Sequence, residues 1–255
     1  MSGATNNPYL ETSRDDLLRI MTAPNAGAHN AVYRGKRLGT EPTEIEYAAI
    51  DAGTFDDMYI GDYWDKGGVN YRIAAFNYFL HTGDTECTTN HVVIVPDACL
   101  YNAAMNSTNT TDSGYVYTQM IASGIKKAND IIKNAFGERH LMMHRNYLST
   151  GATSGRASTG SWFDDSVTIM CEHMVYGSGI FSPVSDGSTV PNNCRVEKSQ
   201  LPLFQHEPSW ICNRTTWWLR DVVSSADFAY VNATGIADYG NATTVLGVRP
   251  YFCIK

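Results

Sequence analysis

The most regular pattern of apolar and polar positions lies between residues 58 and 76. Two runs rich in aromatic and β-branched residues, Met58–Trp64 and Val69–Phe76, flank the string Asp65-Lys66-Gly67-Gly68. A Gly-Gly pair supplies the left-handed backbone that a tight hairpin turn requires. The pattern therefore predicts a β-hairpin.

A helix is predicted directly before this hairpin. It opens at Glu41-Pro42-Thr43-Glu44 and stops at Gly53, because proline suits the first turn of a helix and glycine its end. The face expected to be buried carries Ile45, Ala48 and Ala49.

Two further helices are expected, over residues 97–104 and 113–136. The longer one carries apolar residues at helical spacing from Tyr117 to Ile132 and is followed by Gly137. Both helices are expected to pack on a sheet.

Residues 1–40 are interpreted as a polar N-terminal arm. A short helix is expected after a cap at Thr12 or Ser13, and the glycine- and proline-containing stretch 21–39 is expected to be a loop or linker that extends from the body. The predicted division is an arm over 1–40 and a body over 41–255.

The second half of the chain is expected to alternate long structured loops with short strands. After Leu148 it is rich in Gly, Ser, Thr and Pro, which favours loops. Strand-like pieces follow at 217–220, 227–232 and 245–254, and His91–Val95 is an earlier one. Helices early and short strands late indicate the α+β class.

Composition and charge narrow the classes of partner. The chain has 255 residues, 43% of them hydrophobic, which suffices for a core without disulfides or metal. With 19 basic against 26 acidic side chains and no Lys/Arg cluster, no nucleic-acid partner is expected. No apolar run is long enough for a signal peptide or for membrane insertion. The six cysteines are irregularly spaced and are expected to be free thiols.

Two groups of motifs carry a resemblance to a known family. The strings WWLR (217–220), FAYVN (228–232) and LGVRPYFCI (246–254), with Gly235, resemble the C-terminal signature of C-type-lectin-like domains. The branch resembled is related in fold to the formylglycine-generating enzyme and to the variable proteins of diversity-generating retroelements. The string IGDYWDKGGVNYRIAAFN (60–77) resembles the opening hairpin of such domains in phage and prophage virion proteins.

The resemblance implies a fold, a function and a location. The fold would be C-type-lectin-like, with a small antiparallel sheet, two main helices and long structured loops. The protein would be a non-enzymatic tail or capsid fibre protein of the virion, folded in the bacterial cytoplasm and homotrimeric. The body would bind a host-surface glycan or protein, and the arm would attach to other virion proteins.

In this branch ligands meet the loops that precede the last strands, so the resemblance also implies binding residues. Tyrosine and asparagine suit such a surface because they combine contact area with adaptable hydrogen bonding. Trp217 and Trp218 point to opposite faces of an extended strand, so that one can be core while the other faces a loop or ligand. Alternatively, residues such as Gly240 and Asn241 only form turns. The ligand-binding candidates are Asn213, Arg214, Thr215, Trp217, Tyr230, Asn232, Asp238, Tyr239 and Asn241.

Three residues are assigned structural roles. Trp218 is assigned to the core. Arg220 and Arg249 stand among apolar and aromatic neighbours, and they are expected to bond carbonyls or a carboxylate because a buried unpaired charge is costly. Pro250 is expected to mark a sheet edge or a bulge because it lacks an amide donor.

Neither a metal nor a cofactor is expected. Calcium-dependent lectins carry an acid-Pro-Asn or acid-Pro-Asp tripeptide and a later Trp-Asn-Asp, whereas this chain has Glu207-Pro208-Ser209 and no Trp-Asn-Asp. Cys212 and Cys253 do not stand in the motif of the formylglycine-generating enzymes, so that activity is not carried over.

No catalytic residue is assigned. The adjacent residues Cys171-Glu172-His173 do not form a ready nucleophile and base, and the common hydrolase motifs are absent. The pairs Asp56-Asp57 and Asp164-Asp165 keep a polysaccharide depolymerase open as an alternative, since glycoside hydrolysis uses two carboxyl groups. A purely structural fibre or capsid-decoration subunit is the other alternative.

Overall fold

The predicted hairpin opens the largest sheet of the protein. The computed structural model describes residues 26–182 and 194–255, and in it β2 (Tyr63–Lys66) pairs antiparallel with β3 (Val69–Phe76). Gly67 and Gly68 form the turn with φ values of 61° and 82°, the left-handed backbone that glycine adopts without strain. The hairpin predicted from the sequence is confirmed.

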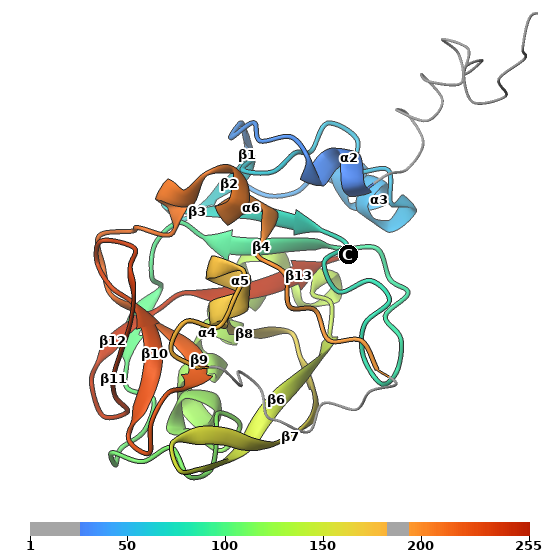
Figure 1. The fold of residues 1–255 in the computed structure, drawn as a ribbon. Helices are drawn as coiled ribbons and strands as arrows, with labels where there is room; N and C mark the ends of the chain where they lie inside the picture. The colour runs from blue at the N-terminus through green and yellow to red at the C-terminus, as the bar shows by residue number, and fades with distance from the viewer. Residues whose placement is uncertain (1–25, 183–193) are drawn as a thin grey trace, which may run out of the picture.

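The last strand of the chain lies inside the same sheet. The sheet has six strands in the order β1-β2-β3-β4-β13-β8, and every pair is antiparallel except β1 with β2. Figure 1 shows β13 beside β4, which separates it from the hairpin. The remaining strands of this sheet are β1 (Arg37–Gly39), β4 (Val92–Pro96), β8 (Val167–Ile169) and β13 (Pro250–Ile254).

Pro250 is therefore not at a sheet edge, contrary to expectation. It is the first residue of an interior strand and stands opposite Ile169. Proline is tolerated there because the first residue of a strand can do without an amide donor.

Two smaller sheets make up the rest of the β structure in the described part of the chain. The second sheet has the order β11-β10-β9-β12-β5, in which β12 runs parallel to β9. Only Arg249 separates β12 from β13, so the chain passes there from the second sheet to the first. The second sheet contains β5 (Tyr101–Ala103), β9 (Trp217–Val222), β10 (Asp227–Val231), β11 (Ala237–Asn241) and β12 (Leu246–Val248), and a long hairpin is formed by β6 (His144–Thr153) and β7 (Arg156–Asp165).

The helices are short apart from two. The two longer ones are α3 (Glu44–Ala52) and α4 (Ile125–Phe136), and α4 continues a π-helical turn, η1 (Met120–Gly124). The others are α2 (Ala26–Asn30), α5 (Glu172–Tyr176) and α6 (Pro202–His206), with 3-10 turns η2 (Glu138–His140) and η3 (Pro208–Trp210). The mixed content confirms the α+β class.

Helix α3 begins and ends as predicted but buries a different face. Thr43 caps it in a reciprocal capping box with Glu46, and Gly53 ends it at φ 71°. Of the three residues expected to be buried, Ala49 is buried, but Ala48 is exposed and Ile45 is 81% exposed. Tyr47 and Ile50 are buried in their place. The helix is turned so that the Tyr47 hydroxyl donates to the Phe136 carbonyl at the end of α4.

Three other predicted elements differ from the structure in whole or in part. Residues 97–104 contain the strand β5 in place of a helix, because pairing with β12 outweighs local preference. The helix predicted over 113–136 is present and ends before Gly137 as expected, but it begins only at Met120, so that Tyr117 precedes it and is exposed. After Leu148 the β6–β7 hairpin continues where loops were expected, and Ser, Thr and Gly fill its strands because much of the hairpin is only partly buried.

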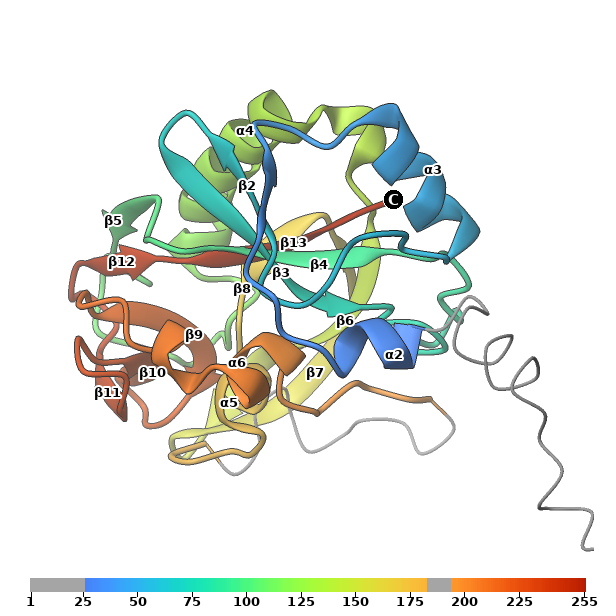
Figure 2. The same ribbon diagram turned by 90° about the horizontal axis from the view of Figure 1, so that it is seen from above.

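The core lies on both faces of the six-stranded sheet. Figure 2 shows α4 on one side of this sheet and α5 and α6 on the other. On the α4 side, Tyr71 and Phe252 contact Phe136 with ring centroids 5.1 and 4.9 Å apart. Tyr251 points to the opposite face, where it packs on Phe79.

The stretch predicted as a linker is, from residue 26 onward, packed on the body. The Asn30 side chain exchanges two hydrogen bonds with the Phe76 backbone, and Arg34 pairs with the buried Asp62 at 2.7 Å. The rest of the predicted arm, including the short helix after Thr12 or Ser13, lies outside the described residues. Among the helices described, none is both long enough and apolar enough to span a membrane.

Candidate functional site

An exposed aromatic pair stands at the edge of the second sheet, on β11. Tyr239 is 46% exposed, and its ring centroid lies 5.0 Å from that of Phe181, which is 37% exposed. Ile180 beside Phe181 in the chain is also exposed. Asn241 is exposed and shares the face of Tyr239, because alternate residues of a strand point the same way. We call Ile180, Phe181, Tyr239 and Asn241 the β11 patch.

A buried carboxylate positions the Phe181 side of the patch. Glu172 opens α5 and is fully buried, and its carboxylate accepts hydrogen bonds from the backbone amides of Ile180 at 2.8 Å, Phe181 at 3.1 Å and Ser182 at 3.0 Å. The buried Asp221 of β9 accepts from the Glu172 amide at 2.7 Å. Charge-assisted bonds of this kind are strong in a buried setting, so Phe181 is held in place before any ligand binds.

Tyr230 and Asp238 lie together on the opposite face of β10 and β11. They are directly paired across the strands, and the Tyr230 hydroxyl donates to the Asp238 carboxylate at 3.1 Å. The Tyr230 ring covers Gly240, where a Cβ atom would stand 2.9 Å from the ring. Partial burial raises the pKa of the Tyr230 hydroxyl. These two residues therefore do not join Tyr239 in one surface.

A third group of predicted residues lies at the other end of β11. Asn232 accepts from the amides of Thr234 and Ile236 at 2.9 and 3.1 Å, which closes the β10–β11 turn. Asn213 accepts from the Thr215 amide at 3.0 Å in the loop before β9. Arg214 in that loop is exposed, with φ at 59°.

The distance between the β11 patch and the group around Asn232 follows from the register of β10 and β11. Ala237 pairs with Val231 next to the turn, whereas Asn241 pairs with Asp227 four residues further along. Four residues of strand span about 13 Å. Apart from Trp217, the predicted ligand residues thus form three groups. Asn232 forms a turn, whereas Gly240 and Asn241, for which turns were the alternative, lie in β11.

The assignment of Trp217 to a ligand is wrong. Its side chain is fully buried in the larger core, and the Arg249 guanidinium carbon lies 5.1 Å from its ring centroid. Trp218 is also fully buried, in a second core cluster on the other face of β9, where its indole donates to the Ala103 carbonyl at 2.9 Å. Both tryptophans are core because β9 is covered on both faces.

The expected carbonyl bonds of the two arginines are confirmed. Arg249 donates to the carbonyls of Pro96 and Trp210, each at 2.8 Å, and burial lowers the pKa of its guanidinium to about 10. Arg220 donates to the Ile169 carbonyl at 3.1 Å. Arg249 thereby ties the point where the chain changes sheets to β4 and to η3.

Ile180 and Phe181 were missed by sequence reasoning. Phe181 stands in a Gly/Ser-rich stretch as an isolated aromatic residue, and nothing local connects it with β11. Glu172 links Phe181 to the second sheet, because it accepts from the Phe181 amide and its own amide donates to Asp221 of β9. In the sequence, Glu172 was considered only together with its neighbours Cys171 and His173. A buried glutamate that accepts three amides has no local sequence signature.

The carboxylate pairs considered for hydrolysis have structural partners. Arg34 and Lys36 hold Asp57 at 2.5 and 2.8 Å and lower the pKa of its carboxyl to about 2. Arg145 pairs with Asp164 at 3.0 Å. Over residues 26–182 and 194–255, no group of three or more His, Cys, Asp or Glu side chains is arranged to hold a metal ion.

Comparison with known proteins gives one partial match. Residues 182–255 match a family described as a domain of unknown function, DUF6273. This segment covers less than half of the chain and contains β9 to β13. A search of curated proteins and a search of solved structures find no match.

Proposed function

We propose that this protein is a non-enzymatic recognition subunit of a phage or prophage particle, a tail or capsid fibre protein that binds a host-surface glycan or protein. The observation that carries the proposal is the exposed pair of Phe181 and Tyr239, fixed to the sheet through Glu172. The binding surface of the proposal is the β11 patch, not the whole set of loop residues.

The sheet topology supports a C-type-lectin-like fold within this proposal. The opening hairpin and the last strand share one sheet, with β4 between them. The string 217–220 lies in β9 and the string 228–232 begins in β10, next to each other in the second sheet. The motifs that carry the resemblance are therefore gathered around one core.

The chemistry of the patch suits recognition of a sugar or a protein surface. Aromatic side chains offer large contact area with little conformational entropy to lose, and partial pre-organisation reduces that loss further. Asn241 adds a hydrogen-bonding amide on the same face. Apolar groups exposed together in this way commonly mark an interaction site.

Binding assays with surface variants test the proposal. Wild-type protein should be retained on intact bacterial cells or on immobilised bacterial surface polysaccharides, and Tyr239→Ala should weaken retention about tenfold, as expected for an aromatic anchor at an interface. Asn241→Ala should weaken it less. Tyr117→Ala is the matched control, since Tyr117 is a 66% exposed tyrosine on the loop before η1.

The proposal fails if Tyr239→Ala and Tyr117→Ala bind as the wild type does.

The same patch also favours a second function, a structural subunit whose copies pack through it. Native mass spectrometry separates the two functions: a homotrimer that Tyr239→Ala dissociates, without retention on any surface, supports the structural subunit.

A further inference from the structure

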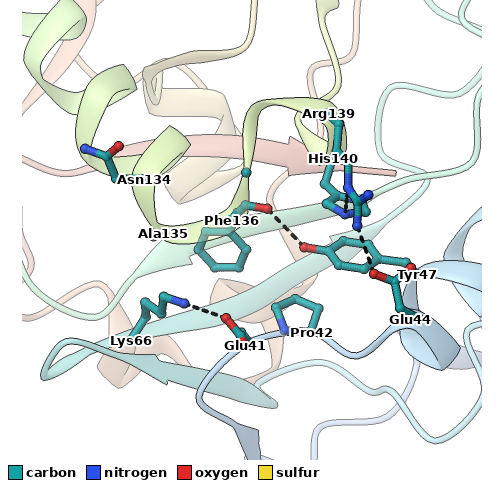
Figure 3. A pocket seen from close by; sticks show the side chains of 11 residues that line it. Glu41, Pro42, Glu44, Tyr47, Lys66, Asn134, Ala135, Phe136, Arg139 and His140 are labelled. Atoms are coloured by element: carbon teal, nitrogen blue, oxygen red, sulfur yellow. Dashed lines mark hydrogen bonds and ion pairs between the residues drawn. The ribbon is translucent and has the colours of Figure 1, made fainter.

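A cavity of about 360 Å³ opens between the start of α3, the end of β2 and the end of α4. Figure 3 shows its wall, which is formed chiefly by Glu41, Glu44, Tyr47, Lys66, Phe136 and Arg139. Its elements belong to the six-stranded sheet and its covering helices, so it is separate from the β11 patch on the second sheet. Its volume lies within the range of small-molecule sites.

Two ion pairs stand at the rim of the cavity. Lys66 Nζ lies 2.6 Å from Glu41, and Arg139 lies 2.9 Å from Glu44. Glu41, Glu44 and Arg139 expose 65%, 81% and 72% of their side chains. Exposed ion pairs contribute little to stability, so a ligand ion can replace either partner at small cost.

The floor between the ion pairs is fixed. The Tyr47 ring stacks on His140 with centroids 3.5 Å apart, and its hydroxyl donates to the Phe136 carbonyl at 3.3 Å. Arg139 Nε donates to His140 Nε2 at 2.8 Å, and burial together with Arg139 lowers the pKa of His140. The imidazole is therefore neutral, and the cavity has two acidic and two basic groups.

The end of α4 adds a preference for positive charge on one side. Asn134 and Ala135 line the cavity from the last turn of the helix. The carbonyls of a last helical turn accept no hydrogen bond from within the helix. Among the described residues, no donor reaches these two carbonyls. The C-terminal end of a helix attracts cations.

We propose that this cavity binds a small zwitterion of the amino-acid or dipeptide class. The carboxylate of the ligand contacts Lys66 and Arg139, and its ammonium contacts Glu41, Glu44 and the free carbonyls of α4. Such a ligand adds one negative and one positive charge to two basic and two acidic groups, so charge stays balanced. A ligand with net charge would leave one group of the rim unpaired. An uncharged ligand would gain hydrogen bonds in which only the protein partner is charged, without the attraction between opposite charges.

Titration with dialanine, followed by amide NMR shifts of the full chain, tests the proposal. Saturable shifts are expected at Ala135, Gly137 and His140. Dialanine blocked at both ends, as the N-acetyl methylamide, should bind about tenfold more weakly because both charges are removed. High salt should weaken binding of the free dipeptide.

Charge variants complete the test. Lys66→Gln and Arg139→Gln should each weaken dialanine binding about threefold to tenfold. Lys133→Gln is the matched control, because Lys133 pairs with Glu138 at 2.7 Å at the same end of α4 but does not line the cavity. The proposal is overturned if the blocked peptide binds as well as dialanine, if wild-type shifts do not saturate, or if all three variants bind alike.

Discussion

Buried charged residues in this protein are held by several donors or acceptors each. Asp62 is fully buried and accepts from the Arg34 guanidinium and from the amides of Lys36 and Tyr59, at 2.7 to 2.9 Å. Glu172 follows the same rule with three amides. Multiple bonds offset the desolvation of a carboxylate, which otherwise destabilises the fold. Asp165 departs from this rule, because among the described residues its Oδ2 atom has no hydrogen-bond partner.

Replacement of Asp165 by Asn should stabilise the protein near neutral pH. Burial raises the pKa of the Asp165 carboxyl from 3.8 to about 6, although Arg220 acts in the opposite direction. Between these values the folded state keeps a proton that the unfolded state releases, so stability falls as pH rises. Asp165→Asn should remove a penalty of about 1–3 kcal/mol, measured by urea unfolding.

The stabilisation by Asp165→Asn should shrink as the pH is lowered from 6 toward 3.8, because the Asp165 carboxyl becomes protonated in the unfolded state as well. Asp164→Asn is the control, because this exposed carboxylate only pairs with Arg145. It should change stability by less than about 1 kcal/mol. A gain for Asp165→Asn that does not depend on pH would contradict the assignment.

At the scale of elements, backbone geometry decides where strands and helices end. The β2–β3 turn places Gly67 and Gly68 in the left-handed region, and Gly53 ends α3 in the same way. Within residues 26–182 and 194–255, and apart from its two chain neighbours, no atom lies within 4 Å of the position that a Cβ would take at Gly68. A substitution there therefore measures backbone strain without a steric clash.

Gly68→Ala should destabilise the protein by about 1–2 kcal/mol through this strain. Gly68→Asn should cost less, because asparagine tolerates the left-handed region better. Gly39→Ala is the matched control in β1, where φ lies outside the left-handed region and the nearest atom to a built Cβ is 3.6 Å away. Urea unfolding at one pH compares the three, and equal losses for Gly68→Ala and Gly39→Ala would refute the argument.

At the scale of the whole molecule, two histidines lie inside the fold. Burial lowers the pKa of His91 to about 4 and that of His144 to about 3. His91 Nε2 accepts from the Phe79 amide at 3.0 Å, and His144 Nε2 lies 3.2 Å from the Tyr251 hydroxyl. Both sit on the side of the sheet away from α4, where Phe79 also packs.

The protein should lose stability on acidification below pH 6.5, the pKa of an unburied histidine. The unfolded state then takes up protons that the folded histidines refuse, which amounts to about 2.7 kcal/mol per pH unit for two histidines. Asp165 opposes this by about 1.4 kcal/mol per unit between pH 6 and 3.8, whereas His140, whose pKa is also lowered, acts in the same direction as the two buried histidines.

Urea midpoints measured between pH 4 and 6 test the linkage. His144→Gln should lower the slope by about 1.4 kcal/mol per pH unit, because the unfolded variant takes up one proton fewer. An unchanged slope would show that His144 is not held neutral in the folded protein.

The sequence by itself determined the local features of the fold. Gly67 with Gly68, and Thr43 with Gly53, act on their own neighbours, so the hairpin and the limits of α3 could be predicted. The strands at 92–96, 217–222 and 227–231 followed from runs of apolar and aromatic residues. The piece predicted over 245–254 is instead two strands, β12 and β13, in different sheets. The carbonyl bonds of Arg220 and Arg249 followed from the cost of burying an unpaired charge.

Only the tertiary structure decided which residues meet. Glu172 accepts a hydrogen bond from the Phe181 amide, and the Phe181 ring contacts Tyr239. The Arg249 guanidinium packs against the Trp217 ring. Both contacts form because segments far apart in sequence pack together. The buried face of α3 and the strand at 101–103 were set by α4 and β12 in the same way. Local pattern fixes turns, caps and apolar runs, whereas sheet order and the covering of each face depend on contacts between distant residues, and the β11 patch arises from those contacts.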